Sequence, residues 1–339
     1  MKIGVVGASG YAGGEILRLL SRHSAFKPHY IAAGSSAGEK ITSIHSHLTQ
    51  YENQSFSATE VGKVNECDLV FLALPHGESA SLINLINADV KIVDLGADFR
   101  LQSEASWKKY YNDSYAGSWL YALPEIPGKR KEIAAASRVS NPGCYATAIA
   151  LAAAPAAQAG AIDVNDIVVV AASGTTGAGR TAKINLSASE IMNSMTSYKF
   201  GGVHQHTPEI EETLTSVAHS PVKVSFTPIL APMPRGILAT VTSHTNKSEA
   251  EMREIYTKAY KSEKFVSLLG PGKLPETSSL IGSNAAHIQV AVDSHTSRAI
   301  ISVAIDNLGK GAAGQAIQNA NIMCGLDEAT GLDAMGIGQ

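Results

Sequence analysis

Cys144 stands where a chain could hold a reactive thiol. Residues 140–150 read SNPGCYATAIA, and the Pro-Gly pair before Cys144 suits a turn into a helix that the helix formers of residues 146–154 continue. A cysteine in the first helical turn lies near unpaired backbone N–H groups, which favour its thiolate and could stabilise an oxyanion on an attacked carbonyl. The alternative is a buried structural cysteine, the commonest fate of a free cysteine. The local sequence fits both interpretations.

Two histidines could exchange a proton with such a thiol. His204 and His206 lie in KFGGVHQHTPEIEETL, residues 199–214, just before a helix that we expect to begin at Pro208-Glu209. An imidazole so placed is positioned and titrates near neutrality, and Glu209 could orient it. A His-x-His pair can also bind metal, but no further ligand cluster is nearby, so we expect no metal site. One of the two histidines could serve only in packing or hydrogen bonding.

Glycines at the start of the chain follow the pattern of a dinucleotide-binding loop. In KIGVVGASGYAGGEILRLL, Gly7, Gly10 and Gly13 follow an apolar strand and open an amphipathic helix. Small residues at these positions let the backbone approach a pyrophosphate, which binds at the helix N-terminus. The strand before and the helix after supply the required context. A tight turn without a ligand is the alternative.

The stretch after the second expected strand favours NADP(H). An NAD-binding protein usually carries Asp or Glu there to hold the ribose 2′-hydroxyl. Here the sequence is IAAGSSAGEK, with no carboxylate before Glu39. Ser35 and Ser36 could donate to a 2′-phosphate, and Lys40 could supply positive charge. Alternatively, the two serines simply form a polar loop.

Arginines in two motifs are candidate anion clamps. Arg100 ends DLGADFR at residues 94–100, and Arg235 lies in PMPRG at residues 232–236. The planar guanidinium suits phosphate or carboxylate, although an arginine taken alone is more often a surface residue. Residues 172–180, ASGTTGAGR, combine small polar residues with Arg180 and predict a loop for an anion or the nicotinamide.

The helices and strands expected to position these residues follow different patterns in the first and second halves of the chain. The expected strands of the first part cover residues 2–6, 30–33, 68–73 and 91–94, with helices at 14–21 and 79–86. This alternation predicts parallel βαβ units, while residues 101–137 look irregular. Later strands are expected at 167–172, 222–227, 237–244, 287–293 and 299–305, with one clear helix at 248–260. Strands in excess of helices predict an α+β domain with a mixed or mostly antiparallel sheet.

These patterns predict an α/β protein of two domains. Residues 1–143 and 311–339 form a Rossmann-type NADP-binding domain, because the helix expected at 311–323 packs back on the first part of the chain. Residues 144–310 form a catalytic and oligomerisation domain. The length of 339 residues is sufficient for two such domains.

Composition narrows the class of partner. With 27 basic and 30 acidic residues the net charge is −3, so we expect neither nucleic acid nor membrane as a partner. Cys67, Cys144 and Cys324 form no disulfide or zinc pattern, which fits the reducing cytoplasm. The chain contains no apolar run long enough for a transmembrane helix, and its first residues enter a strand at once, which leaves no room for a signal peptide.

Together the motifs resemble those of the N-acetyl-γ-glutamyl-phosphate reductase family, within the aspartate-semialdehyde dehydrogenase-like superfamily. The motifs are GASGYAG at 7–13, FLALPHG at 71–77, DLGADFR at 94–100, NPGCYATA at 141–148, SGTTGAGR at 173–180, HQHTPEI at 204–210, PMPRGI at 232–237 and DNLGKGAAGQAIQ at 306–318. The sequence departs from the family at Gln205, where the family usually has Arg, and at Ala146, where it usually has Pro. The first departure could alter substrate contacts.

The resemblance implies a role for each motif. Cys144 would be the nucleophile and His206, three residues before Glu209, the acid–base. The cofactor site would comprise Gly7, Ser9, Gly10, Tyr11, Gly13, Ser35, Ser36, Pro75, Gly177 and Gln315, and the substrate site Arg100, Asn141, His204 and Arg235.

The implied reaction is the NADPH-dependent reductive dephosphorylation of N-acetyl-γ-glutamyl phosphate, in arginine biosynthesis. It would give N-acetylglutamate 5-semialdehyde and inorganic phosphate through a cysteine thioester, in a cytoplasmic homodimer or homotetramer. Three alternatives remain. They are the same chemistry on a carrier-bound aminoadipyl or glutamyl phosphate, a non-catalytic NADP sensor, and a structural subunit of a larger assembly.

Overall fold

A parallel sheet of six strands forms the first half of the fold. The computed structural model describes residues 1–111 and 114–338. The strand order is β2-β1-β3-β4-β6-β5, and every neighbouring pair is parallel. The strands are β1 (Lys2–Val6), β2 (Lys27–Ala32), β3 (Leu69–Leu72), β4 (Lys91–Asp94), β5 (Leu120–Tyr121) and β6 (Arg138–Ser140). The central strand β3 is buried along its whole length, as its unbroken apolar run predicts.

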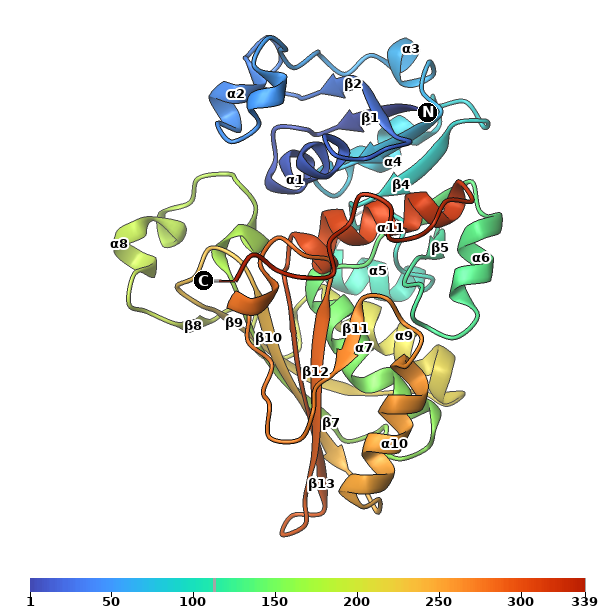
Figure 1. The fold of residues 1–339 in the computed structure, drawn as a ribbon, viewed down its shortest axis with the longest axis vertical. Helices are drawn as coiled ribbons and strands as arrows, with labels where there is room; N and C mark the ends of the chain where they lie inside the picture. The colour runs from blue at the N-terminus through green and yellow to red at the C-terminus, as the bar shows by residue number, and fades with distance from the viewer. Residues whose placement is uncertain (112–113, 339) are drawn as a thin grey trace.

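Helices cover both faces of this sheet, and one of them comes from the end of the chain (Figure 1). They are α1 (Tyr11–Leu20), α2 (Ile41–Ile44), α3 (Val61–Val64), α4 (Glu78–Ile83), α5 (Glu104–Tyr111), α6 (Lys129–Ala135) and α11 (Gly314–Met323). Helix α11 packs against α1, α6 and β4, and Ile317 belongs to the same apolar cluster as Ile3. The C-terminal helix therefore lies against elements of the first sheet. It begins later than expected, because a π-helical turn, η5 (Gly309–Ala313), precedes it.

Part of the segment that looked irregular is regular. Residues 101–137, of which 112–113 lie outside the described residues, contain α5, β5 and α6. Helix α5 fully buries Trp107, and α6 buries Ile133. Short helices with a single buried anchor leave little apolar periodicity in the sequence, which is why the pattern did not reveal them.

The second sheet is mixed. Its order is β11-β12-β13-β10-β7-β9-β8, with β11/β12 and β7/β9 parallel and the other pairs antiparallel. The strands are β7 (Ile167–Ser173), β8 (Thr196–Ser197), β9 (Val224–Leu230), β10 (Ile237–His244), β11 (Val266–Leu268), β12 (Ala286–Asp293) and β13 (Arg298–Ile305). This sheet confirms the α+β prediction for the second half of the chain.

Three helices cover one face of the second sheet: α7 (Cys144–Gln158), α9 (His206–Ala218) and α10 (Glu249–Tyr260). Short helices connect the remaining segments: η1 (Thr49–Tyr51), η2 (Thr175–Ala178), η3 (Ile184–Leu186), α8 (Ala188–Ile191) and η4 (Ser278–Leu280). The alanine-rich α7 is buried on nearly all sides, because its small side chains let the sheet and both other helices approach. Ser248 caps α10 in a capping box with Glu251.

The opposite face of the second sheet carries exposed apolar side chains. Along β7, β10 and β13 the even-numbered residues point away from the helices. The strand register places even-numbered residues of neighbouring strands opposite one another. Val170, Leu238 and Ile300 on this face are 45%, 38% and 36% exposed. We call these three residues the open-face cluster.

Candidate active site

Helix α7 begins at Cys144, with Gly143 in the N-cap position. The thiol therefore lies in the first turn, as predicted, and is half-buried. Glycines allow two close approaches at this helix start. A Cβ atom on Gly311, in the π-helical turn, would lie 2.8 Å from Cys144 Cβ, and a Cβ on Gly143 would lie 2.7 Å from His206 Cε1. The structure thus places the predicted acid–base against the residue that precedes the predicted nucleophile.

The Cys144 thiol is protonated at neutral pH in the free protein. Burial raises its pKa to about 11, against the opposing effects of the Tyr145 backbone N–H and the charge of Arg100. The N–H groups of the first helical turn do favour the thiolate, as expected, but the loss of hydration on burial outweighs them.

The His206 imidazole is neutral at neutral pH. Burial, followed by the charge of Arg100, lowers its pKa to about 3. Its Nδ1 atom has no hydrogen-bond partner among the described residues. Helix α9 begins at His206 rather than at Pro208, because proline needs no N–H partner within a first helical turn.

His204 forms a hydrogen bond with the backbone of His206 and packs among aromatic rings. Its Nδ1 accepts the backbone N–H of His206 at 3.1 Å, and its ring makes edge contacts with Tyr145, Tyr198 and Phe226. Burial lowers the pKa of His204 to about 2, so this ring is neutral as well. Since Nδ1 is an acceptor here, the proton of the neutral ring lies on Nε2. The predicted contact between His204 and substrate stays a prediction.

Glu209 holds the start of α7 rather than the imidazole. Its Oε1 accepts the Gly143 backbone N–H at 2.6 Å and the Tyr121 hydroxyl at 2.7 Å. Its Oε2 lies 3.4 Å from Arg100 Nη1. The interpretation that Glu209 orients His206 is therefore wrong: the N-cap amide, the phenol and the guanidinium occupy its carboxylate.

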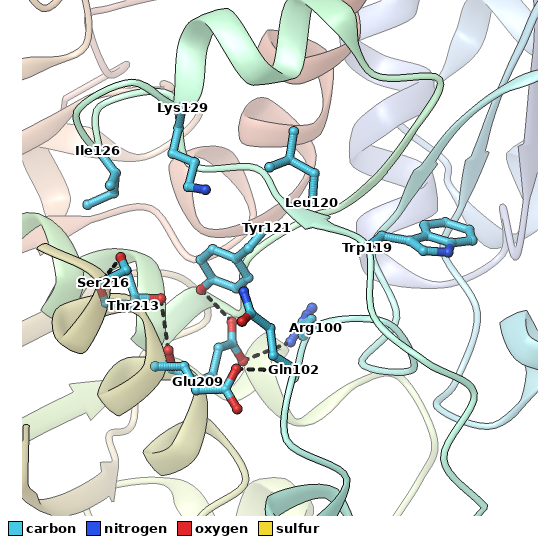
Figure 2. A pocket seen from close by; sticks show the side chains of 11 residues that line it. Arg100, Gln102, Trp119, Leu120, Tyr121, Ile126, Lys129, Glu209, Thr213 and Ser216 are labelled. Atoms are coloured by element: carbon cyan, nitrogen blue, oxygen red, sulfur yellow. Dashed lines mark hydrogen bonds and ion pairs between the residues drawn. The ribbon is translucent and has the colours of Figure 1, made fainter. Parts of the chain in front are cut away.

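Arg100 is a buried cation beside the site. It is 9% exposed, and its Nε and Nη2 donate to the carbonyl oxygens of Asn141 and Leu95 at 2.8 and 2.7 Å. Although burial disfavours its charge, Glu209 raises the pKa of Arg100. Figure 2 shows Arg100, Tyr121 and Glu209 facing one another at a cavity of about 80 Å³, which Trp119, Lys129 and Glu212 also line. Tyr121 escaped the sequence analysis, because nothing in its neighbourhood indicates a partner 88 residues away.

Asn141 and Arg235, both expected to bind substrate, have protein partners. Asn141 is 1% exposed, donates to Ala312 O at 3.1 Å and accepts from Asn319 at 3.0 Å. Arg235 forms ion pairs with Asp306 at 2.6 Å and with Glu15 at 3.0 Å. Asn141 therefore joins the cysteine loop to the segment that leads into α11. Arg235 joins the second sheet to α1, and a substrate contact would compete with these bonds.

The glycine loop fits a dinucleotide. Gly7 has a φ of +82°, and a Cβ there would lie 2.7 Å from the carbonyl carbon of Ala73. The N-cap Gly10 offers no side chain to α1, and the first turn from Tyr11 contains no acidic residue. Backbone N–H groups at this helix start are thus available to a pyrophosphate. Ser9 and Gly13 complete the loop, half-buried and buried respectively.

The other predicted cofactor residues lie at the ends of both sheets. Ser35 and Ser36 form a solvent-accessible turn after β2, and Pro75 is exposed before α4. Gly177 lies in η2, where a Cβ would be 3.0 Å from Ser173 Oγ. Gln315 is fully buried, and its Oε1 has no partner among the described residues. An unsatisfied buried amide oxygen fits a hydrogen-bond donor of a bound ligand.

Within residues 1–111 and 114–338, no cluster of three or more His, Cys, Asp or Glu side chains is placed to hold a metal ion. In the same part of the chain, no helix has the length and apolarity needed to cross a membrane.

Each half of the chain matches a known domain family. Residues 2–136 match the semialdehyde dehydrogenase NAD-binding domain, and residues 144–307 match the semialdehyde dehydrogenase dimerisation domain. The chain is 50% identical to the N-acetyl-γ-glutamyl-phosphate reductase of Acidothermus cellulolyticus over 99% of this chain and 98% of that protein. It is 50% identical to that of Frankia casuarinae over the same shares, and 47% identical to that of Streptomyces coelicolor over 99% of both.

Solved structures show the same fold at low identity. Aspartate semialdehyde dehydrogenase II from Vibrio cholerae superposes with a TM-score of 0.71 at 18% identity, covering 95% of this chain and 98% of that chain. The Candida albicans aspartate semialdehyde dehydrogenase with NADP gives a TM-score of 0.71 at 16% identity, with the same coverage.

Proposed function

We propose a cysteine-thioester mechanism for this chain from the premise that it belongs to the N-acetyl-γ-glutamyl-phosphate reductase family. The chain is accordingly an NADP-dependent oxidoreductase that reduces N-acetyl-γ-glutamyl phosphate in arginine biosynthesis. The mechanism rests on one observation. Gly143, which directly precedes Cys144 at the start of α7, lies against the neutral His206 ring.

Acylation couples proton transfer to attack on the substrate. As the sulfur attacks the acyl carbon, His206 takes the proton of Cys144, because pKa values of about 11 and about 3 disfavour a separate transfer beforehand. The bond between the acyl carbon and the phosphate oxygen breaks, inorganic phosphate leaves with the electron pair, and a thioester remains on Cys144. Arg100 supports this step with a positive charge that is close enough to act on both Cys144 and His206.

Bound NADPH supplies the hydride that reduces the thioester carbonyl. The protonated His206 donates its proton to the developing oxyanion, which gives a thiohemiacetal on Cys144. His206 then takes the hydroxyl proton back, the C–S bond breaks with its electron pair going to sulfur, and the semialdehyde leaves. Return of the proton from His206 to the sulfur regenerates the Cys144 thiol. In this scheme Glu209 is a positioning residue, because it holds the Gly143 amide and not the reacting atoms.

The fit of the chain to the cofactor comes from the glycine loop and from the buried Gln315 oxygen. The division at residue 144, with residues 311–339 returning to the first domain, is part of this proposal. So is a homodimer or homotetramer formed through the open-face cluster, since residues 144–307 match a dimerisation domain. We place the protein in the cytoplasm, where its three free cysteines would stay reduced.

The test runs the reaction in the oxidative direction. Phosphate-dependent reduction of NADP⁺ is measured with N-acetylglutamate 5-semialdehyde and with aspartate semialdehyde, for the wild type, Cys144→Ser and the half-buried control Cys324→Ser. We expect activity with the acetylated substrate alone, lost only in Cys144→Ser. Activity that survives Cys144→Ser contradicts the covalent mechanism. Inactivity with both aldehydes would favour a carrier-bound substrate or a sensor.

A further inference from the structure

We propose that Arg180 binds a phosphate group of the NADP cofactor, reaching the glycine loop from the second sheet. The assignment rests on the function proposed above and adds a residue that specifies the cofactor.

The position of Arg180 follows from the chain after β7. The strand ends at Ser173, η2 follows, and Gly179, with a φ of +83°, turns the chain toward the first sheet. Arg180 Nη2 donates to the carbonyl oxygen of Ile44 at 2.8 Å, and Nη1 donates to that of Ser9 at 3.5 Å. One element of the catalytic half thereby lies against the dinucleotide-binding half.

The contacts of Arg180 lie beside the glycine loop and the start of α1. Ser9 lies between Gly7 and Gly10 of the loop, and Ile44 ends α2. The guanidinium also lies over the ring of Tyr11, 5.5 Å from its centroid, and Tyr11 is the first residue of α1. Arg180, from the second half of the chain, therefore lies at the N-terminus of α1, where we expect the cofactor to bind.

The Arg180 side chain is exposed and has no acidic partner among the described residues. Arg100 and Arg235 each pair with a buried carboxylate, whereas within the described part of the chain no carboxylate forms an ion pair with Arg180. Its protein partners are two carbonyl oxygens and a ring face, which use only part of its five N–H donors. The α1 start adds positive partial charge and has no acidic residue in its first turn. The Arg180 guanidinium and the N-terminus of α1 are both positive and, within the residues described, have no acidic partner nearby, which favours the binding of a phosphate group.

Two phosphate groups of the cofactor have the required chemistry. The pyrophosphate is common to NADPH and NADH, whereas the 2′-phosphate occurs in NADPH alone. Comparing the two cofactors therefore distinguishes the two sources while testing the same residue.

The experiment measures equilibrium dissociation constants of full-length protein for NADPH and NADH by nicotinamide fluorescence, without acyl substrate. The variants are Arg180→Gln, Arg180→Lys and the control Arg22→Gln, an exposed arginine beyond the opposite end of α1. We expect Arg180→Gln to weaken NADPH binding about tenfold. Arg180→Lys should lose less, because it keeps the charge but not the planar fork. The control should bind like the wild type.

Equal losses for NADPH and NADH would assign Arg180 to the pyrophosphate, and a loss confined to NADPH would assign it to the 2′-phosphate. Binding of both cofactors by Arg180→Gln at control affinity would overturn the proposal. Thermal unfolding of the free variants checks the fold, and Arg180→Lys decides the matter if Arg180→Gln does not fold. Since no step involves Cys144, a failed thioester mechanism leaves this measurement unaffected.

Discussion

Gly143 and His206 are in such close contact that no side chain fits between them. A Cβ atom on Gly143 would lie 2.7 Å from His206 Cε1, and it would also lie 2.8 Å from Arg100 Nη1. The N-cap of α7 is thus in direct contact with the imidazole ring. Any side chain at position 143 would have to displace His206 or Arg100.

Replacing this glycine should therefore affect catalysis more than stability. We expect Gly143→Ala to displace His206 and to lower kcat by about 100-fold, since small displacements of reacting groups carry such costs. Steady-state kinetics and thermal unfolding would check this. Gly62→Ala is the control, because a Cβ at Gly62 meets no atom within 4 Å. A Gly143→Ala enzyme with wild-type kcat would show that the imidazole does not need this contact.

The reactivity of Cys144 should rise with pH across the neutral range. Its pKa is raised to about 11 and that of His206 lowered to about 3, so the free protein holds a thiol and a neutral imidazole between these values. Only the thiolate is alkylated, and its fraction grows about tenfold per pH unit below the pKa. We expect iodoacetamide inactivation to accelerate from pH 6 to pH 10 without a plateau. A plateau near pH 7 would instead indicate a preformed thiolate–imidazolium pair.

A buried ion pair holds the π-helical turn beside Cys144. Lys310 Nζ lies 2.7 Å from Glu125 Oε1, and both side chains are fully buried. Lys310 also donates to Gln318 Oε1 at 2.8 Å. Although burial opposes its ionisation, Lys310 holds the pKa of Glu125 below its ordinary value.

Removing one partner should cost more than removing both. We expect Lys310→Met to lower the free energy of unfolding by about 3–5 kcal/mol, because it leaves a buried carboxylate without its cation. The double variant Lys310→Met/Glu125→Leu should recover most of that loss. Urea unfolding of the two variants decides the matter. If the double variant were the less stable of the two, the pair itself would be the stabilising element.

The open-face cluster should be buried between copies of the chain. Charge at Val170 and Leu238 would be desolvated in such an interface, so we expect Val170→Glu/Leu238→Glu to reduce the oligomer to a smaller species. Light scattering after size-exclusion chromatography gives the mass. Leu85→Glu is the control, because Leu85 is 59% exposed on the first domain. An unchanged mass for the double variant would move the interface elsewhere.

Local sequence patterns predicted much of the fold and part of the candidate site. Apolar runs predicted the strands Lys91–Asp94 and Ile237–His244 with their observed bounds, and the Pro-Gly pair predicted the helix start at Cys144. The carboxylate of Glu209 could not be assigned in this way. Its partners Arg100 and Tyr121 are 109 and 88 residues distant, and only the folded chain brings them together. The thiol pKa likewise depends on burial by segments remote in sequence.

The place of α11 has a consequence for synthesis on the ribosome. Ala316, Ile317 and Ala320 complete the apolar cluster around Ile3 and Val5, at the opposite end of the chain. During translation the dinucleotide-binding half emerges first, but its core lacks these side chains until the last residues have been added. Vectorial folding of that half is thereby delayed to the moment of chain release. A ribosome-stalled chain that ends before residue 314 should remain protease-sensitive in its first 140 residues.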